Sequence, residues 1–437
     1  MMEVVNLQKI RKTIMTMRHT AKGIIVLLAL VAGISAEAQD SGYFRKAVRE
    51  LSSRKYQGRG YARNGVRKAA KYIAREFSRA GADTVILQPF TLDINTFPGK
   101  AKLSVDGRRL KAGEGFTMRE FSPGAHGRFK LYHIDTLGYD TQRIFDDLAR
   151  EENKDCFVVF DFWSSYKHSE DFKRLQSADG CTNAGIVFTW DTPLKFYKAY
   201  GERVNAKPVI WVGPDFPRDA RSIKADIDNR FYKGYRTENV IAKVSGSRHD
   251  SCFVFVAHYD HLGNLGRKLY YPGANDNASG TAGIMSLAAH YAANRPEYDM
   301  YFIAFSGEDA NLRGSQYFAE HPVMPLESIR YMINLDMIGD NNPVQYCEVS
   351  DAGESGFRLF EKLNGEYGQF EKLERGELAA NSDHYPFAQL GVPVIFFENE
   401  NGDAFPYYHT DRDDMSTVRF ETFDKLMTLV RAFIDRY

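Results

Sequence analysis

Two adjacent acids, Glu308 and Asp309, follow the apolar segment MYFIAF at residues 300–305 after two intervening residues. A buried strand rarely continues straight into two carboxylates, because burying a charge is costly unless the charge is paired or binds a metal. This pair is therefore a candidate for metal binding or for proton transfer.

Other polar residues also stand where apolar segments end. His258 and Asp260 come at the end of CFVFVAH, and Asp336 ends YMINLD. Three more segments carry similar groups: Asp276 in GANDNASG, Asp383 and His384 in NSDHYPF, and Tyr408 and His409 in YYHTDRDD. Ligands of open α/β sheets bind beyond the carboxyl ends of the strands, so we expect these side chains to converge. Imidazoles and carboxylates without thiolates suit a catalytic zinc site.

The segments that must position these residues alternate in type. Residues 64–81 show the apolar spacing of an amphipathic helix, and VILQPF predicts a strand. After residue 238, apolar strands such as NVIAKV and VPVIFFE alternate with helical segments such as SGTAGIMSLAAHYAAN. This alternation predicts an α/β fold with a mostly parallel central sheet and helices on both faces.

Composition narrows the function classes. The 437 residues contain 57 basic and 57 acidic side chains, so the formal net charge gives no reason to expect nucleic-acid binding. Four cysteines do not build a disulfide scaffold, although the sequence allows a bridge between Cys156 and Cys181.

The N-terminus indicates export. From Met17 a short basic stretch precedes the apolar run Gly23–Ile34 and the small-residue pattern around Ala36 and Ala38. We expect residues 1–38 to be a cleaved signal peptide and the protein to be periplasmic or secreted, without a stable membrane anchor after cleavage. A buried or anchoring helix is the alternative interpretation.

Five motifs in order carry a resemblance: AHYDHLG, PGANDNASG, SGEDANLRGS, NLDMIGD and YYHTDRDD. Together they resemble the co-catalytic di-zinc aminopeptidases of peptidase family M28. The resemblance is strong from Glu238 to about Val418 and weaker through LSSRKYQGRGYARNG at residues 51–65. A set of five ordered motifs is far more specific than any single one.

The resemblance implies a set of metal ligands. His258 and Asp336 would bind one Zn²⁺, Asp309 and His409 would bind a second, and Asp276 would bridge both. Asp260 would orient the His258 imidazole, and a cis peptide bond is implied after Asp276. The family pattern has Glu-Glu where this chain has Glu308 and Asp309. Because aspartate is one methylene shorter, we expect weaker binding at the second site.

The resemblance also implies catalytic roles. Glu308 would take a proton from the attacking water and deliver it to the leaving amine, and Tyr408 would donate a hydrogen bond to the oxyanion. The implied function is an exported zinc aminopeptidase that removes N-terminal residues from peptides. Asp383 and His384 either support the ligands or line the pocket wall. His261 is expected near the rim without being a ligand, and Ser279 is expected to cap a helix.

The middle of the chain is predicted to be an insertion. Its segment RLQSADGCTNAGIVFTW followed by KPVIWV resembles a protease-associated domain. We therefore assign residues 39–94 and 237–437 to the catalytic domain and 95–236 to this β-rich insertion, which would form a wall of the cleft. An unrelated β-rich elaboration is the alternative.

Two other functions fit the same sequence. A glutaminyl-peptide cyclotransferase uses related ligands on the same fold with one zinc, although NDNASG is more typical of the peptidases. A peptide-binding relative without catalysis is the other alternative, and the complete set of ligands, base and Tyr408 argues against it.

Overall fold

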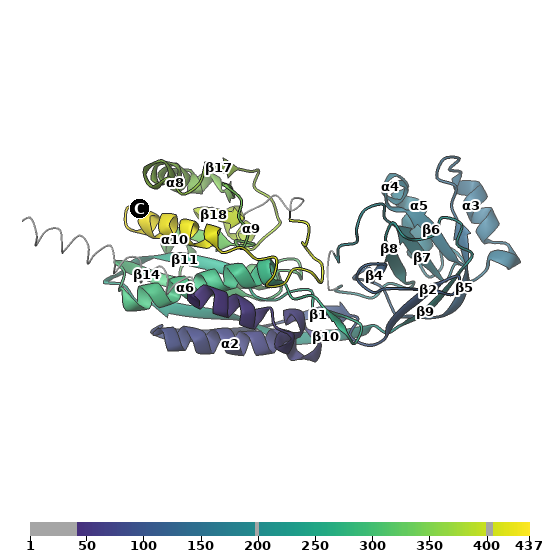
Figure 1. Cartoon of the computed structure of the whole chain (residues 1–437), viewed down its shortest axis with the longest axis horizontal. Helices are drawn as coiled ribbons and strands as arrows, with labels where there is room; N and C mark the ends of the chain where they lie inside the picture. Colours follow the sequence, from purple (N-terminus) through teal and green to yellow (C-terminus); the bar gives the residue numbers. More distant parts are fainter. Residues whose placement is uncertain (1–41, 197–200, 399–404) are drawn as a thin grey trace, which may run out of the picture.

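The computed structural model describes residues 42–196, 201–398 and 405–437, which form two lobes (Figure 1). The signal peptide predicted for residues 1–38 lies outside the described residues. Each lobe is built on a sheet of eight strands, and a separate two-stranded ribbon accompanies them.

The main sheet has four parallel strands at its centre. Its strand order is β1-β10-β14-β11-β15-β18-β16-β17, and β14, β11, β15 and β18 run parallel to their neighbours within that group. The strands β1, β10 and β16 pair antiparallel at the flanks. Their bounds are β1 Thr84–Thr96, β10 Arg230–Val244, β11 Arg248–His258, β14 Tyr298–Phe305, β15 Ile329–Leu335, β16 Val344–Val349, β17 Lys372–Arg375 and β18 Val394–Glu398.

Helices cover both faces of this sheet. Successive residues of a strand point to opposite faces, and in β11 Phe253 and Phe255 enter one core while Val254 and Val256 enter another. The first core holds α2, α6, α8 and α10, and the second holds α7 and α9. The bounds of these helices are α2 Gly65–Ala80, α6 Gly280–Ala293, α7 Arg313–Glu320, α8 Glu354–Tyr367, α9 Tyr385–Gln389 and α10 Glu421–Ile434. The predicted α/β fold with a mostly parallel centre is confirmed.

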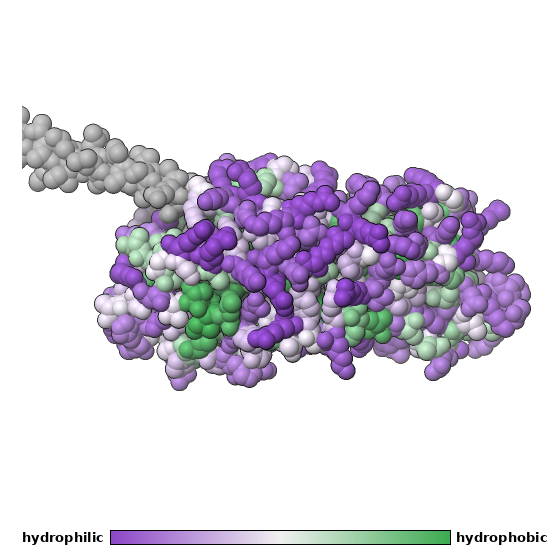
Figure 2. All heavy atoms as spheres, turned by 90° about the horizontal axis from the view of Figure 1, so that it is seen from below, coloured by the Kyte–Doolittle hydropathy of each residue, from purple (hydrophilic) through white to green (hydrophobic). Residues whose placement is uncertain are grey.

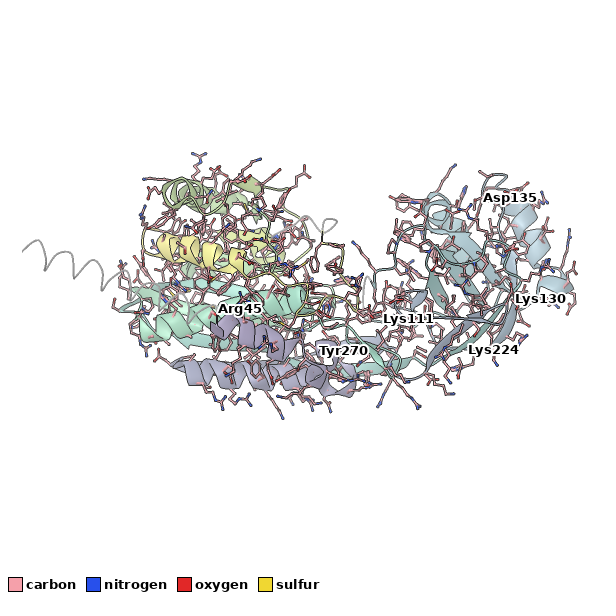
Figure 3. All side chains as sticks on the ribbon, viewed as in Figure 1. Arg45, Lys111, Lys130, Asp135, Lys224 and Tyr270 are labelled. Atoms are coloured by element: carbon pink, nitrogen blue, oxygen red, sulfur yellow. The ribbon has the colours of Figure 1, made fainter. Side chains whose placement is uncertain are left out.

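A second sheet forms the other lobe. Its order is β3-β2-β9-β5-β6-β7-β8-β4, and short apolar strands predicted from the sequence lie at its centre. The bounds are β2 Ala101–Val105, β3 Arg108–Leu110, β4 Phe116–Met118, β5 Ala125–His133, β6 Phe157–Asp161, β7 Gly185–Thr189, β8 Val209–Val212 and β9 Ser222–Ile227, with helices α3 Thr141–Leu148, α4 Phe162–Lys167 and α5 Ser169–Gln176. The labelled residues Lys130, Asp135 and Lys224 mark this lobe, and Arg45 marks the main-sheet lobe (Figure 3).

The two lobes share one long ribbon and one apolar core. Strands β1 and β10 pair continuously from Thr84 opposite Lys243 to Thr96 opposite Arg230, apart from one irregularity, and the second sheet lies between them in sequence. Loop residues Leu262 and Tyr271, which follow β11, are buried in the same core as the second sheet. The loop that follows His258 is therefore packed against the second lobe.

Several smaller elements lie outside the two large sheets. A helix covers residues 42–51, and the ribbon pairs β12 Asn264–Leu265 with β13 Leu269–Tyr270. Short helical turns are η1 Arg54–Arg59, η2 Ala62–Asn64, η3 Glu151–Asn153, η4 Ala274–Ser279, η5 Leu326–Ser328 and η6 Asp351–Gly353. The four cysteines are free thiols, so the bridge that the sequence allowed between Cys156 and Cys181 does not form.

Hydrophilic side chains cover most of the molecular face seen in Figure 2. Within the described ranges, none of the helices combines the length and the apolar character needed to cross a bilayer.

Candidate metal centre and active site

The sequence-predicted polar residues meet at the carboxyl edge of the main sheet. His258 is the last residue of β11, Glu308 and Asp309 follow β14, and Asp336 follows β15. Asp276 lies in η4 just before α6, and His409 lies in the turn region that precedes α10. All of these segments belong to the rim where ligands of α/β sheets bind.

The first group of side chains surrounds His258. Its Nε2 lies 3.3 Å from Asp336 Oδ2, 3.4 Å from Asp276 Oδ1 and 3.8 Å from Glu308 Oε2. Ligand atoms of His258, Glu308 and Asp336 all lie within 4.8 Å of one another. Such a set has the spacing that a small divalent cation requires.

The second group of side chains meets at Asp276. His409 Nε2 lies 3.0 Å from Asp276 Oδ2 and 3.8 Å from Asp309 Oδ1. His261, which we expected near the rim, also reaches this group: its Nδ1 lies 3.4 Å from Asp309 Oδ2 and 3.7 Å from Asp276 Oδ2. Asp276 thus offers one oxygen to each group, as the bridging role requires.

Several polar atoms of the site are buried without a hydrogen-bond partner among the described residues. They include Asp276 Oδ2, Asp309 Oδ2 and both ring nitrogens of His261. Buried polar atoms normally have partners, because each unsatisfied one costs about 1–3 kcal/mol. Carboxylates and imidazoles that face each other with free lone pairs fit one or more bound zinc ions, since zinc accepts both ligand types.

The electrostatics of the two groups agree with a cation site. Burial opposes ionisation of Asp276, but His261, His258 and His409 together hold its pKa well below the usual range. Burial alone would lower the pKa of His258, but Asp336 and Glu308 raise it well above its ordinary value. The cluster is therefore a concentration of buried charge that a divalent cation would neutralise.

The loop that carries Asp276 is held by side chains on other segments. Asp413 accepts hydrogen bonds from the main-chain N–H groups of Asn275 and Asp276, at 2.8 and 2.9 Å. The fully buried Arg59 donates to the Asp276 carbonyl at 3.0 Å and to the Gly273 carbonyl at 2.7 Å. The Asp276–Asn277 peptide bond is cis, which confirms the expectation drawn from the resemblance.

Gly280 shows how closely this loop approaches the sheet. A β-carbon at Gly280 would lie 2.0 Å from the Leu335 carbonyl oxygen, so no larger residue fits there without movement. Asn277 donates to the same carbonyl at 3.0 Å. The end of β15 and the start of α6 are thereby brought together, with Asp336 and Asp276 on adjacent segments.

Asp260 supports the site in a way that the sequence indicated only in part. Its carboxylate lies 3.9 Å from His258 Nδ1, while its main-chain carbonyl lies closer to that nitrogen, at 3.2 Å. The carboxylate instead accepts from Tyr61 Oη at 2.7 Å and from the Glu308 N–H at 3.2 Å. Burial raises the pKa of Asp260 to about 6. Asp260 therefore links His258 to the main chain of Glu308.

The proposed base and donor stand at the same rim. The Glu308 side chain is 13% exposed, and burial raises its pKa well above the usual range, with the carboxylates of Asp309 and Asp336 adding to the rise. The Tyr408 ring stacks on the His409 ring with 3.8 Å between centroids. A carboxyl group with a raised pKa next to a partly open pocket is suited to proton transfer.

Asp383 and His384 are completely buried behind the rim. Burial raises the pKa of Asp383 to about 7. His384 Nε2 lies 3.1 Å from Glu348 Oε2 and its ring stacks on Phe396. Neighbouring Ser382 donates to Asp336 Oδ2 at 2.8 Å. This segment thus touches a candidate ligand through Ser382.

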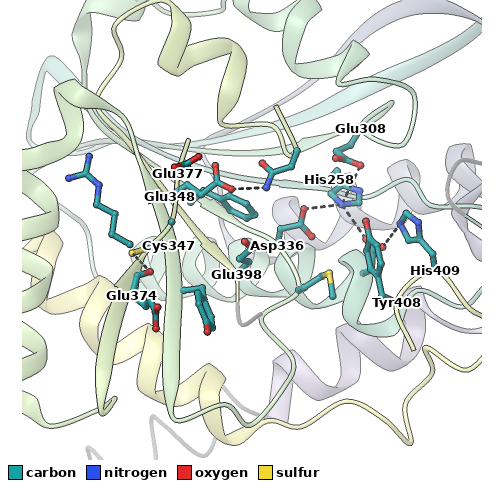
Figure 4. Close-up of a pocket in the computed structure, with 17 residues that line it drawn as sticks. His258, Glu308, Asp336, Cys347, Glu348, Glu374, Glu377, Glu398, Tyr408 and His409 are labelled. Carbon is teal, nitrogen blue, oxygen red and sulfur yellow. Dashed lines mark hydrogen bonds and ion pairs between the residues drawn. The ribbon is translucent and has the colours of Figure 1, made fainter. Parts of the chain in front are cut away.

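A pocket opens next to these residues (Figure 4). Its volume is about 500 Å³, and His258, Asp276, Glu308, Asp336, Tyr408 and His409 line one part of it. The remaining wall includes Glu348, Glu374, Glu377, Glu398 and Phe396. The pocket is large enough for part of a peptide and reaches the two carboxylate–imidazole groups.

Sequence reasoning missed four side chains that act on the site: Arg59, Tyr61, Ser382 and Asp413. Arg59 and Tyr61 lie in the segment where the resemblance was weaker, and Asp413 lies in YYHTDRDD. The sequence motifs that contain these residues are recognisable, but the spacing of residues within a motif does not show which distant atoms a side chain contacts.

Solved structures share this fold. The structure of BSAP, a zinc aminopeptidase from Bacillus subtilis, aligns with 90% of this chain and 94% of its own, at a TM-score of 0.68 and 20% identity. A peptidase M28 precursor from Shewanella amazonensis aligns over 91% of this chain and 96% of its own, at a TM-score of 0.66 and 17% identity. The molecule has the fold of the zinc aminopeptidases.

Sequence comparison finds a family match for the C-terminal part of the chain. Residues 239–434 of the 437 residues match the model of peptidase family M28. Aminopeptidase YwaD of Bacillus subtilis is 26% identical over 220 residues, which cover 48% of this chain and 47% of that protein. A probable zinc metalloprotease of Pyrenophora tritici-repentis is 38% identical over 220 residues, 41% of this chain and 45% of that protein. The chain thus spans about half the length of the curated relatives it matches.

Proposed function

We propose that this protein is an exported zinc aminopeptidase that hydrolyses the N-terminal peptide bond of peptides. The observation that carries the proposal is the meeting of five side chains at one rim: His258, Asp336, Asp276, Asp309 and His409. One carboxylate oxygen each of Asp276 and Asp309 has no hydrogen-bond partner among the described residues. The match of residues 239–434 to peptidase family M28 and the zinc aminopeptidase fold support the same assignment.

The metal ligands follow from the two groups. His258 and Asp336 would hold one zinc ion, Asp309 and His409 would hold a second, and Asp276 would contribute one oxygen to each. Zinc bound here supplies Lewis-acid polarisation of the scissile carbonyl and of the attacking water.

Glu308 would act as the general base and acid. Its carboxylate is at the pocket edge, 3.8 Å from His258, where it can accept a proton from a water that attacks the substrate carbonyl. The same carboxyl group then gives this proton to the leaving amine. The raised pKa of Glu308 favours this exchange, because it makes the carboxylate a better proton acceptor than an ordinary glutamate.

Tyr408 would stabilise the tetrahedral oxyanion. Its ring is fixed against His409, and the residue lines the pocket together with Glu308. A donor aimed at the developing oxyanion is worth about 3 kcal/mol of transition-state stabilisation. Asp260 and Asp383 would hold this arrangement in place from behind the rim.

The second lobe would form one wall of the cleft, consistent with the predicted protease-associated-like insertion at residues 95–236. The Phe196 N–H donates to the His409 carbonyl at 2.9 Å, and Lys195 Nζ lies 5.5 Å from the centre of the Tyr408 ring. These contacts bring the second lobe to the proposed ligand and oxyanion donor. They support a role for this lobe in admitting substrates.

The test is a panel of aminoacyl amides, free peptides and N-terminally blocked peptides, assayed after chelation and again with added zinc. We expect release of single N-terminal residues from free peptides, no cleavage of the blocked peptides, and activity that zinc restores. Cleavage of blocked peptides at an equal rate would contradict the aminopeptidase assignment.

Two outcomes of the same panel would favour the alternatives. Cyclisation of glutaminyl peptides without any hydrolysis would identify a cyclotransferase. Peptide binding without turnover, in protein that retains no zinc, would identify a non-catalytic relative.

A further inference from the structure

His261 is a buried imidazole that no established role accounts for. It lies in the loop after β11, three residues beyond His258, and its side chain is fully buried. Neither ring nitrogen has a hydrogen-bond partner among the described residues. A buried ring with two unpartnered nitrogens is costly, so a group that uses one of them is expected.

The Nδ1 atom of His261 points into the second carboxylate–imidazole group. It lies 3.4 Å from Asp309 Oδ2 and 3.7 Å from Asp276 Oδ2. His409 approaches the same two carboxylates from the other side. Its Nε2 lies 3.8 Å from Asp309 Oδ1 and 3.0 Å from Asp276 Oδ2. The four residues therefore form a ring in which imidazoles and carboxylates alternate.

The edges of this ring match a zinc coordination shell. Ligand atoms about 2.0–2.2 Å from a tetrahedral zinc ion lie about 3.3–3.6 Å from each other. His261 Nδ1 lies 3.4 Å from Asp309 Oδ2 and 3.7 Å from Asp276 Oδ2, and His409 Nε2 lies 3.0 Å from the same Asp276 oxygen, so these three edges scatter around that separation. The fourth edge, 3.8 Å from His409 Nε2, ends on the other Asp309 oxygen, Oδ1. Two imidazoles and two carboxylates also form a donor set that zinc accepts.

We propose that His261 is a ligand of the second metal ion, through Nδ1, together with Asp309, His409 and Asp276. This inference rests on the proposed metal centre and adds a ligand to it. The opposite side of the centre, with His258, Asp336 and Asp276, has no such additional imidazole in the described structure.

A supporting role for His261 explains the geometry less well. An imidazole that only orients Asp309 would donate a hydrogen bond to it, but neither ring nitrogen of His261 forms one. Asp309 instead turns one oxygen toward each imidazole, Oδ2 toward His261 and Oδ1 toward His409. A fourth ligand would also offset the short reach of Asp309.

The added ligand makes the two sites unequal. Four protein ligands fill a tetrahedral zinc site, whereas three ligands leave one position open, as in catalytic sites. The site of His261 would then mainly hold Asp276 and neutralise charge. The site of His258 would keep the open position beside Glu308, which lies 3.8 Å from it.

The test measures zinc and cobalt affinity of the full-length protein at each site by equilibrium dialysis. The variants are His261→Ala and His261→Phe, where Phe keeps most of the ring volume and removes the donor. His321→Ala is the matched control, because His321 is an exposed histidine of the same lobe outside the centre. His409→Ala and Asp309→Asn are the positive controls for the second site.

We expect both His261 variants to raise the Kd of the second ion by about 100-fold, since even groups behind a ligand change affinity by about 10–100-fold. The first ion should stay within about threefold of the parent, as should both ions in His321→Ala. A folded His261→Phe protein that binds the second ion within threefold of the parent would overturn the proposal.

A second measurement needs no variant. X-ray absorption of the fully zinc-loaded parent should show three imidazoles shared by the two ions, and two imidazoles would exclude His261. If the parent binds no zinc, or if His409→Ala and Asp309→Asn leave binding unchanged, the proposed function itself fails. That pattern differs from failure of His261 alone.

Discussion

Each ionisable residue of the centre takes its properties from its neighbours. Asp276 is a buried carboxyl group and Glu308 a largely buried one, yet their pKa values shift in opposite directions. Three imidazoles surround Asp276 and favour its charged form, whereas Asp309 and Asp336 disfavour the charge on Glu308. This difference separates a carboxylate suited to hold cations from one suited to carry a proton.

The variant Glu308→Gln tests whether this residue is the general base. The amide keeps the size of the side chain and cannot accept the proton, so kcat should fall by at least about 10²–10⁴-fold. Zinc content, measured by elemental analysis, should stay at the parent level. Glu320→Gln, at the exposed end of α7, is the control and should turn over like the parent. Parental turnover in Glu308→Gln would show that another group is the base.

Elements bring these residues together through a few buried contacts between segments. The Arg59 guanidinium at the end of η1 donates to carbonyls of Tyr259, Pro272, Gly273 and Asp276. It thereby ties the loop after β11 to the loop before α6, although burial lowers the pKa of Arg59 to about 10. One side chain thus fixes the spacing of two segments that carry candidate ligands.

A comparable group of buried polar contacts lies at the opposite edge of the sheet, around Asp299. Asp299 at the start of β14 is 7% exposed in its side chain and receives Lys243 at 2.7 Å, the Gly246 N–H at 2.9 Å and His249 at 2.8 Å. Burial alone would raise the pKa of Asp299, but these donors together hold it below the ordinary value of 3.8. The lower pKa means that folding favours the charged form.

Asp299→Asn should therefore destabilise the protein by about 1–3 kcal/mol at neutral pH. Because the folded-state pKa is depressed, the stabilisation is present above pH 3.8 and is lost as the pH falls through the folded value. Urea unfolding at several pH values should show the difference from the parent shrinking below about pH 4. Asp250→Asn, at a fully exposed ion pair, is the control and should change stability much less. A difference that does not change with pH would contradict the assignment.

On the scale of the whole molecule, the metal centre and the two lobes depend on each other. Loop residues after β11 are buried in the core of the second sheet, and Arg313 on α7 pairs with Glu202 from the other lobe. The same loop carries Asp260 and His261. Occupancy of the metal centre should therefore influence how firmly the lobes are joined.

Removal of metal should lower the thermal stability of the whole chain. Bound zinc at about a thousand times its Kd stabilises the folded state by about 4 kcal/mol, and its loss exposes the mutual repulsion of the buried carboxylates. We expect chelation to lower the Tm by about 5–10 °C, measured by differential scanning calorimetry. Added zinc should restore the Tm, whereas Mg²⁺, which prefers octahedral oxygen ligands, should not. An unchanged Tm after complete metal removal would contradict a zinc centre.

Local hydrophobic patterns in the sequence predicted much of the fold. Apolar runs predicted β11, β14, β15 and β18, and helical spacing predicted α2 and α6, because burial on a sheet or helix repeats at a fixed period. Elements with a weaker hydrophobic pattern were not predicted. These are β16, β17 and α8, which lie in a polar segment where no apolar run is longer than a few residues. The two strands at the β16–β17 edge of the main sheet were thus visible only in the structure, whereas β1 and β10 at the other edge were predicted.

The sequence by itself determined which side chains were available for metal chemistry and which strand ends would carry them, since residue type and strand position are local properties. Only the tertiary structure decided that His261 faces Asp309, that Tyr61 holds Asp260, and that Asp413 holds the loop of Asp276. These contacts join segments tens to hundreds of residues apart in the chain. Their atoms meet because of how the sheet, helices and second lobe pack, and no periodic pattern along one segment records that packing.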